Sequence, residues 1–227
     1  MTTQGAGAVT PARRRGLADE AADRIREAIF TGIYAPETQL REVDLSVALD
    51  VSRGPVREAL LRLEGEGLVR SEWHRGATVT TLSADDVAEL ESLRGALEQL
   101  AVRQVIAHAT DEDIAAIERA AERMVRVADH HEMVSCDIAF HDAVYAAARH
   151  RRLEQAWQAI RCQVHLYLLT RIGVSTDGYL TLIPDEHREL AAALRARDAR
   201  AAELFDTHRR RASDVLTTRR TARPDAG

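Results

Sequence analysis

Aromatic side chains are scarce in this 227-residue chain, where phenylalanine, tryptophan and tyrosine together make up 4% of the residues. Alanine, leucine, arginine and glutamate are abundant instead, and these residues favour helices over the strands of a sandwich or barrel. Hydrophobic residues reach 45%, enough for a packed core in one large domain or two small ones. We therefore expect a mainly helical globular protein.

Cysteine is rare and long apolar segments are absent. Cys136 and Cys162 have the spacing of neither a disulfide framework nor a zinc finger, so they are expected to be reduced thiols that fill core space. No stretch has the length of a membrane span, and Arg13 to Arg15 lead into charged sequence rather than the apolar segment of a secretory signal. The sequence predicts a cytoplasmic protein with no membrane partner.

An excess of positive charge is also missing. The chain has 31 basic and 36 acidic residues, and its formal net charge is −5. Proteins that coat nucleic acid by bulk attraction are usually basic overall. Any contact with nucleic acid must therefore come from a local arrangement of side chains.

Helical and strand periodicities divide the first part of the chain into short elements. The small, polar residues of 1–14 predict a mobile tail. Besides the helix described next, the periodicities predict helices over 17–30 and 42–49 and hairpin strands over 68–73 and 76–81. Three apolar side chains of the second of these helices are expected to face inward: Leu45, Ala48 and Leu49.

Another helix begins where a glycine and a proline stand side by side, at Gly54 and Pro55. Neither residue breaks a helix in its first turn, because the N–H groups there have no partner inside the helix, and Ser52 is a suitable N-cap. Arg53 and Arg57 lie one turn apart and point outward. Two short helices, a tight turn and a following hairpin predict a winged helix-turn-helix over residues 15–82.

Arginine suits a helix that enters the DNA major groove, because its planar fork can bond both acceptors of a guanine edge or clamp a phosphate. On the pattern alone, a solvated helix face in a small bundle explains Arg53 and Arg57 equally well. Both interpretations, a DNA-binding helix and a solvent-exposed helix face with no binding role, remain open at this point.

From Ser83 onward the sequence predicts helices almost without interruption. Ser83 is expected to cap the first of them, since Asp85 and Asp86 suit the positive end of its dipole. The predicted helices cover 83–108, 111–129, 132–148, 153–171, a segment that Pro184 opens, and 198–216. The expected fold class is thus mainly α, with an all-α six-helix bundle over residues 83–216 and a flexible tail over 217–227.

One helix of the bundle carries a pair of side chains that could bind a metal. Asp137 and His141 are four residues apart and project from one face, which neighbouring apolar residues turn inward. A buried carboxylate is costly unless its charge is compensated. His187 and His208 could complete a set of one oxygen and three imidazole nitrogens around a divalent ion. A hydrogen-bonded Asp–His pair without metal is the alternative.

Motifs in both halves resemble the GntR superfamily of bacterial transcription regulators. The signature of its recognition helix is matched by VSRGPVREAL over 51–60, then by Leu63, GLV over 67–69, and Arg75 with Gly76. The helical half resembles the FCD domain of the FadR-like branch. Its motifs are matched by Arg94 and Glu98, by Asp137 with Phe140 and His141, and by Glu186, His187, Arg188, Asp198 and His208.

The resemblance implies a role for each matching residue. The residues that the resemblance implies to contact DNA are Arg41, Ser52, Arg53, Gly54, Arg57, Arg75 and Gly76. Of these, Arg75 and Gly76 belong to the wing and would lie at the minor groove or the DNA backbone. The implied metal ligands are Asp137, His141, His187 and His208. They would hold a divalent ion, zinc with nickel and manganese as alternatives, and Arg94 matches an arginine that holds the acid group of an effector beside it.

The chain departs from the family pattern at several turns. Gly54 replaces a threonine whose hydroxyl could bind phosphate, and Asp50 and Glu37 stand where glycine is usual, although both residues can still turn. Relatives often have an asparagine–proline turn where this chain has residues 150–152, which puts an effector contact there in doubt.

The predicted function is a non-enzymatic regulator that binds double-stranded operator DNA as a homodimer and responds to a small organic acid at the metal site. Two alternatives remain open. A metal-dependent hydrolase would need a general base, for which Glu186 is the nearest candidate. A purely structural metal would only stabilise the bundle.

Overall fold

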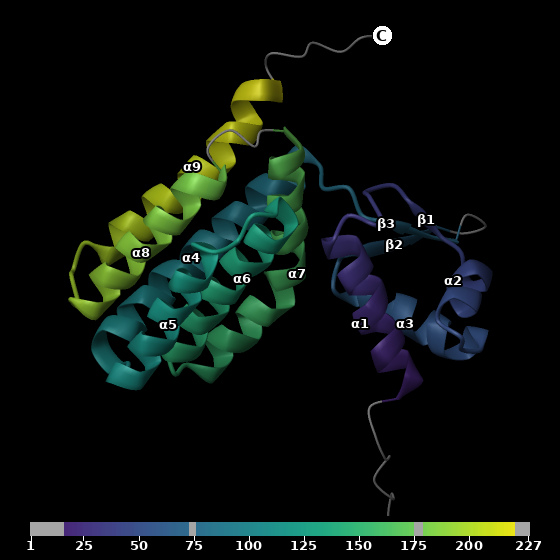
Figure 1. Cartoon of the computed structure of the whole chain (residues 1–227), viewed down its shortest axis with the longest axis horizontal. Coiled ribbons are helices and arrows are strands. Elements are labelled where there is room, and N and C mark those ends of the chain that lie inside the picture. The colour runs from purple at the N-terminus through teal and green to yellow at the C-terminus, as the bar shows by residue number, and fades with distance from the viewer. Residues whose placement is uncertain (1–15, 73–75, 175–178, 221–227) are drawn as a thin grey trace, which may run out of the picture.

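The computed structural model describes residues 16–72, 76–174 and 179–220, which form two adjacent bodies (Figure 1). The smaller body contains α1 (Leu17–Phe30), β1 (Gln39–Leu40), α2 (Glu42–Ala48), α3 (Arg53–Gly65), β2 (Val69–Glu72) and β3 (Gly76–Val79). The larger body contains α4 (Ala84–His108), α5 (Asp111–Met124), α6 (His130–Ala147), α7 (Arg151–Val174), α8 (Tyr179–Arg195) and α9 (Ala201–Arg220). The predicted mainly α fold, a winged helix-turn-helix followed by an all-α bundle, is confirmed.

The strands form a small antiparallel sheet in which β3 lies between β1 and β2. β2 and β3 pair from Val69 opposite Val79 to Glu72 opposite Gly76, which is the predicted hairpin. Its tip, residues 73–75, lies outside the described residues, and so does the expected contact residue Arg75. β1 escapes sequence prediction because two residues are too few to show an alternating pattern.

Helix α3 begins directly after Ser52, so Gly54 and Pro55 lie in its first turn as predicted. The Ser52 side chain accepts no capping hydrogen bond, and this residue holds the N-cap position through its extended backbone alone. Arg53 and Arg57 are exposed. The apolar stripe of the helix is buried at Val56, Ala59, Leu60 and Leu63.

Helix α2 packs on α3 through fewer side chains than predicted. Leu45 is buried and Leu49 partly buried, but Ala48 is exposed, so its expected inward position is wrong. The helix has only seven residues, and Leu49, which directly follows it, packs against the core in place of Ala48.

Two turns of the smaller body place non-glycine residues in the left-handed region. The φ angle is 68° at Glu37 and 51° at Asp50. The sequence predicts that both residues can turn where glycine is usual, and the structure confirms it. An L residue in this region is strained by roughly 1–2 kcal/mol, less for aspartate, whose side chain can bond locally.

Helices α4 and α5 begin with reciprocal caps. Ser83 is the N-cap of α4, as predicted, and its Oγ accepts a hydrogen bond from the N–H of Asp86. The carboxylate of Asp86 in turn accepts one from the N–H of Ser83, which is not foreseen from the sequence. Thr110 and Asp113 repeat the arrangement on α5. The largest apolar side chains buried in the bundle are Trp157, Tyr145, Tyr167, Phe140 and Phe205.

Helix α8 begins at Tyr179, well before Pro184, so the prediction that proline opens this helix is wrong. Tyr179 and Ile183 are buried, and burial of these large side chains offsets the backbone hydrogen bond that a proline inside the helix cannot donate. Helix α9 starts at Ala201 and continues to Arg220, through the first residues of the stretch predicted to be a tail.

Helix α5 ends at Met124, earlier than predicted, because Asp129 has another role. Its side chain accepts a hydrogen bond from the N–H of Glu132 and caps α6, which therefore begins at His130.

None of the helices within the described residues combines the length and apolar character needed to cross a membrane.

Helix α7 of the bundle also packs against the smaller body. The rings of Phe30 at the end of α1 and His165 on α7 stack in parallel, with their centres 3.6 Å apart. Cys162 and Leu166 of α7 belong to the hydrophobic core of the smaller body. His131 on α6 adds a hydrogen bond from Nδ1 to the carbonyl oxygen of Phe30, 3.0 Å long. The two bodies therefore share a packed interface.

Candidate metal centre and nucleic-acid interface

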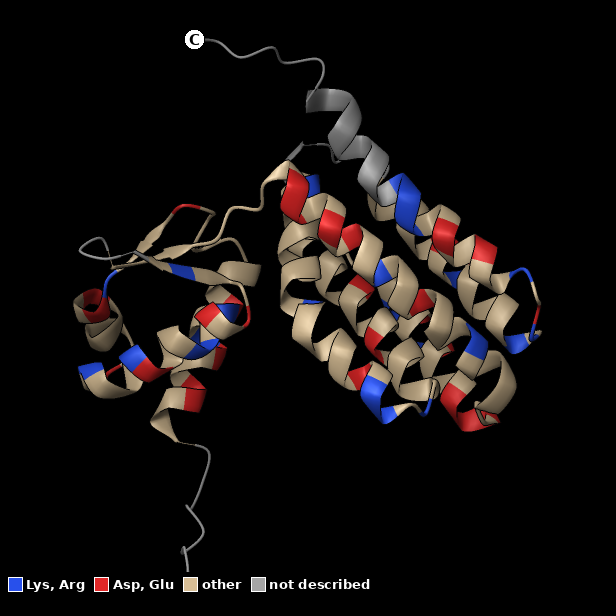
Figure 2. Cartoon of the chain, turned by 180° about the vertical axis from the view of Figure 1, so that it is seen from behind, with Lys and Arg blue, Asp and Glu red and all other residues tan. Residues whose placement is uncertain are grey.

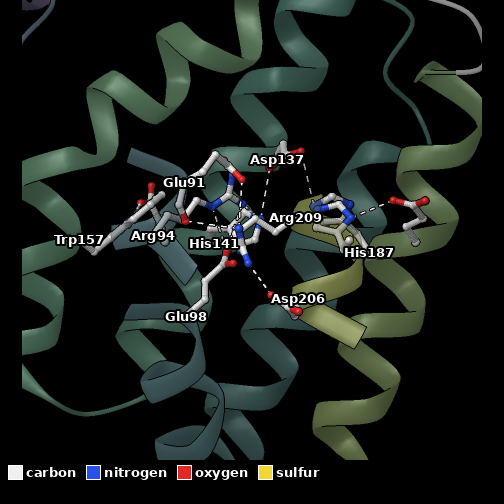
Figure 3. Close-up of polar contacts among 12 residues, drawn as sticks. Glu91, Arg94, Glu98, Asp137, His141, Trp157, His187, Asp206 and Arg209 are labelled. Atoms are coloured by element: carbon white, nitrogen blue, oxygen red, sulfur yellow. Dashed lines mark hydrogen bonds and ion pairs between the residues drawn. The ribbon is translucent and has the colours of Figure 1, made fainter. Parts of the chain in front are cut away.

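Three histidines from three helices converge inside the bundle (Figure 3). His141 lies on α6, His187 on α8 and His208 on α9, and one ring nitrogen of each lies within 4.8 Å of the others. All three residues are buried. The sequence contains no local signal for this convergence, because the three residues are far apart along the chain.

Hydrogen bonds orient two of these rings. His187 Nδ1 donates to the carbonyl oxygen of Ile183 at 2.8 Å, which leaves its Nε2 with a lone pair and no partner in the described part of the chain. His208 Nδ1 lies 2.8 Å from Oε2 of Glu186, which can only accept when ionised. Burial lowers the pKa of His208 to about 4, so its ring is neutral near pH 7 and able to bind a metal.

Asp137 lies beside two of the histidines. Its Oδ1 is 3.4 Å from His141 Nε2 and its Oδ2 is 3.7 Å from His187 Nε2. Burial opposes ionisation of this carboxyl, but His187, His141 and His208 together hold its pKa far below the usual range. Oδ1 has no hydrogen-bond partner among the residues that the structure describes. The structure thus brings the four predicted ligands together.

This donor set fits a divalent transition metal. Imidazole nitrogen with one carboxylate oxygen suits zinc, nickel or manganese. Two of the buried atoms, Nε2 of His187 and Oδ1 of Asp137, lack a hydrogen-bond partner among the described residues, and a bound cation would satisfy both. The hydrogen bonds to Ile183 and Glu186 are those that commonly orient metal-binding histidines.

Arg94 on α4 lies against this cluster and is only 1% exposed. Its Nη2 donates to His141 Nε2 at 2.9 Å, and Nε and Nη2 both donate to Glu98 Oε1. The same Glu98 oxygen is 2.9 Å from His141 Nδ1. Burial opposes ionisation of Glu98, yet Arg94 and His141 lower its pKa to about 2.

Sequence reasoning assigns Arg94 but misses several of its neighbours. Glu98 matches a motif without being given a role, and the ion pairs of Arg209 with Glu91 and Asp206 are unforeseen (Figure 3). The spacing of four between Arg94 and Glu98 is a helical signal that could have identified that pair. The contact of Arg209 with Glu91 joins α9 to α4 and has no such signal.

Those of the expected DNA-contacting residues that the structure describes are exposed on the smaller body. Arg57 forms a two-bonded ion pair with Glu42, with N–O distances of 3.0 and 2.9 Å, while remaining exposed. A Cβ atom placed at Gly54 would have no neighbouring heavy atom within 4 Å, so a side chain at this position would point into solvent. Arg41, at the N-cap of α2, is also exposed.

A surface hollow of about 570 Å³ lies between β1, the start of α2 and α3. Arg41, Arg57 and Gly76 line it, while Ser52, Arg53 and Gly54 lie at the exposed start of α3. Basic and acidic residues are interspersed over both bodies (Figure 2). This agrees with the inference that a nucleic-acid contact must be local.

Comparison with known proteins decides the family. Residues 17–79 match the family described as "Bacterial regulatory proteins, gntR family", and residues 89–209, more than half of the chain, match the FCD domain. The chain belongs to the GntR family of bacterial regulatory proteins. It is a GntR-family transcriptional regulator with an FCD domain, and transcription regulation through DNA binding is the activity of this family.

Relatives cover most of the chain. The HTH-type transcriptional regulator YdhC of Bacillus subtilis is 27% identical over 185 residues, 80% of this chain and 82% of its own. A D-xylose utilization operon transcriptional repressor of Paenarthrobacter nicotinovorans is 30% identical over 86% of each chain. The crystal structure of a GntR transcriptional regulator from Rhodococcus sp. RHA1 has a TM-score of 0.76 and 25% identity, and covers 88% of this chain and 97% of its own.

Proposed function

We propose that this GntR-family regulator binds operator DNA as a homodimer in the cytoplasm, and that a small carboxylate bound at a divalent-metal site modulates this binding. The DNA-binding domain would span residues 15–82 and the metal- and effector-binding domain residues 83–216. The observation that carries the proposal is the convergence of His141, His187 and His208 with Asp137, directly beside the buried guanidinium of Arg94.

Asp137, His141, His187 and His208 would hold the metal, with zinc, nickel or manganese fitting this donor set. When bound, the ion would supply a Lewis-acidic centre for an acid group. Arg94 supplies a permanent positive charge beside it and has one buried donor, Nη1, with no acceptor among the described residues. A carboxylate is the ligand group that such a donor and charge favour.

Contacts along α7 support coupling between this site and the DNA-binding body. Asp142, next to His141, accepts hydrogen bonds from Trp157 and Arg161 of α7. Cys162, the next residue on α7, contacts Glu66 at the C-terminus of α3. A shift of α7 would therefore move the end of the helix that reads DNA.

Small movements are sufficient in a dimer. Half-sites for two recognition helices lie one helical turn apart, about 34 Å, so a small rotation of either DNA-binding domain breaks the match. Coupling of this kind is typically about 1–3 kcal/mol, or about 5–150-fold in affinity.

The test combines metal analysis with DNA binding. We expect the wild-type protein to retain one divalent ion per chain, His141→Ala and His187→Ala to lose it, and His108→Ala, an exposed histidine at the end of α4, to keep it. Fluorescence anisotropy then measures binding to a duplex selected from a random library. One or more small carboxylic acids should change this affinity about fivefold or more, and only with metal present. Unchanged affinity with every acid and after chelation would overturn the proposal.

The same experiment separates the alternatives. Chelation that lowers the melting temperature, without a response to any acid, would indicate a structural metal. Ester or phosphoester turnover that His187→Ala abolishes would indicate a hydrolase. Nothing in the described geometry favours the hydrolase, because Glu186 is engaged by His208 and by Arg211 and is not free to activate water.

A further inference from the structure

Three tyrosine hydroxyl groups are buried inside the helical bundle without a hydrogen-bond partner in the described ranges. They belong to Tyr145 on α6, Tyr167 on α7 and Tyr179 on α8, and none of these residues is more than 3% exposed. Native proteins usually satisfy such groups with a protein atom, a water molecule or a ligand. Three unsatisfied hydroxyls in one region therefore indicate a polar ligand.

Two arginines have unused donors in the same region. Nη1 of Arg94 and Nε of Arg171 are buried and have no acceptor among the described residues. The guanidinium of Arg171 lies 5.2 Å from the ring centre of Tyr179. Arg161 and Arg188 each form an ion pair with a carboxylate, whereas Arg171 forms none within the described part of the chain.

The positive charges of Arg94 and Arg171 affect the pKa of the same hydroxyl groups. Burial raises the pKa of the Tyr179 hydroxyl, and the charges of Arg171 and Arg94 both oppose the rise. The same two charges oppose the rise that burial causes in the pKa of Tyr167. The negative charge of Asp137 also reaches Tyr179. Tyr179 thus lies in the electrostatic neighbourhood of one proposed metal ligand and of both arginines.

The charges in this region favour a ligand with two negative charges. Asp137 would offset one of the two charges of a divalent ion, while Glu98 is paired with Arg94 and Glu91 with Arg209. The ion and Arg171 would then leave two positive charges without a counterion. Uncompensated charge is costly away from water, and two carboxylates would neutralise it.

We propose that the effector is a small dicarboxylate that spans the two arginines. Arg94 binds one carboxylate beside the histidine cluster. Arg171 binds the other, together with the hydroxyl groups of Tyr167 and Tyr179, which donate to its oxygens. This inference rests on the proposed function, since it describes the second end of the ligand whose first end lies at the metal site.

Isothermal titration calorimetry of the full chain, loaded with zinc and freed of excess zinc, tests this assignment. Malonate, succinate and glutarate are compared with propionate, butyrate and valerate, which have matching chain lengths and a single acid group. We expect at least one dicarboxylate to bind about tenfold or more tightly than its matched monocarboxylate, because only the dicarboxylate forms a second charge-assisted pair.

Single substitutions test which side chains bind the second carboxylate of the ligand. Arg171→Gln should lower the affinity for the dicarboxylate to that of the monocarboxylate and leave the monocarboxylate affinity unchanged. Arg103→Gln, which removes an exposed arginine of α4, should change neither. Tyr179→Phe should weaken the dicarboxylate several-fold while raising the melting temperature of the ligand-free protein, because it removes an unsatisfied buried hydroxyl. A tyrosine with only a structural role would not give this opposite pair of effects.

Equal affinity of the wild-type protein for the two series of acids would overturn this inference and leave the proposed function standing. A dicarboxylate preference that survives Arg171→Gln would also overturn it. If the zinc-loaded protein binds no acid of either series, both the inference and the proposed carboxylate response are wrong.

Discussion

At the scale of single residues, a hydrogen bond donated by one ring nitrogen of a histidine leaves a lone pair on the other nitrogen, which can then bind a metal. The carbonyl of Ile183 and the carboxylate of Glu186 accept from Nδ1 of His187 and His208, so that Nε2 of each ring keeps its lone pair. Two of the four proposed ligands are therefore oriented by the protein before any ion binds. The same bond explains why Glu186, the general-base candidate from sequence, is unsuited to that role.

Another buried histidine, His165, makes the stability of the protein depend on pH. Burial, followed by the charge of Arg161, lowers its pKa from 6.5 to about 3, although Asp137 and Asp142 act in the opposite direction. Between these two pH values the unfolded chain binds a proton that the folded protein does not, so stability falls as pH falls. At pH 5 this group should have lost about 2 kcal/mol of the stability that it contributes at neutral pH.

The prediction is measured with urea unfolding at a series of pH values. His165→Phe keeps an aromatic ring on Phe30 but cannot titrate. The free energy of unfolding of the wild type should therefore decline more steeply between pH 6.5 and 5 than that of the variant. Because other histidines titrate in both proteins, only the difference between the two curves reports His165. Parallel curves over this range would show that the prediction is wrong.

At the scale of elements, short turns hold the helices of the smaller body at fixed angles. Glu37 lies in the left-handed region, and its N–H donates to the carbonyl oxygen of Val79, which ties the turn to β3. Gly67, with a φ of 75°, ends the link from α3 to β2, and a Cβ there would lie 2.7 Å from the side chain of Gln163 on α7. The positive φ makes glycine the favoured residue at this position, and any larger residue would also have to displace the Gln163 side chain.

Substitution at the first of these turns should be stabilising. Glu37→Gly relieves the strain of an L residue and should raise the free energy of unfolding by about 0.5–1 kcal/mol, after allowance for the greater freedom of glycine in the unfolded chain. Glu37→Ala should bring no such gain. The same change inside a helix, Glu27→Gly on the exposed face of α1, should destabilise by about 1 kcal/mol. Chemical denaturation measures all three, and a destabilised Glu37→Gly would contradict the prediction.

At the scale of the whole molecule, α7 belongs to two cores. Its buried residues Trp157 and Val164 pack in the bundle, whereas Cys162 and Leu166 pack with the smaller body. Arg26 of α1 forms a two-bonded ion pair with Glu66, which Cys162 also contacts. The end of the recognition helix thus meets α1 and α7 at one point.

This shared interface should make the two bodies unfold together. Phe30→Ala removes the stack on His165 and should cost about 1–3 kcal/mol of interface stability, because a large aromatic contact is lost. Differential scanning calorimetry should then resolve two transitions in place of one. Ile33→Ala, which truncates an apolar side chain that is 73% exposed, should keep a single transition. A single unshifted transition in Phe30→Ala would mean that the stack does not join the bodies.

Local signals along the chain were sufficient to predict most helices, the wing hairpin and the Asp137–His141 pair. These features depend on residues that are at most a few positions apart, and periodicity, caps and turn residues record them directly. Helix boundaries were less predictable, as at Pro184 and Asp129, because burial and capping partners override the preference of single residues. Resemblance to a family, rather than periodicity, favoured the complete ligand set over a hydrogen-bonded Asp–His pair without metal.

Only the tertiary structure decided which distant residues meet. The contacts of Arg94 with His141, of Glu186 with His208 and of Phe30 with His165 join different helices, and their geometry depends on how those helices pack. The unsatisfied hydroxyls of the buried tyrosines are likewise invisible in sequence, since a hydroxyl becomes unsatisfied only when packing removes water from it. Sequence determined the elements and the chemistry they carry, and packing decided which groups face one another.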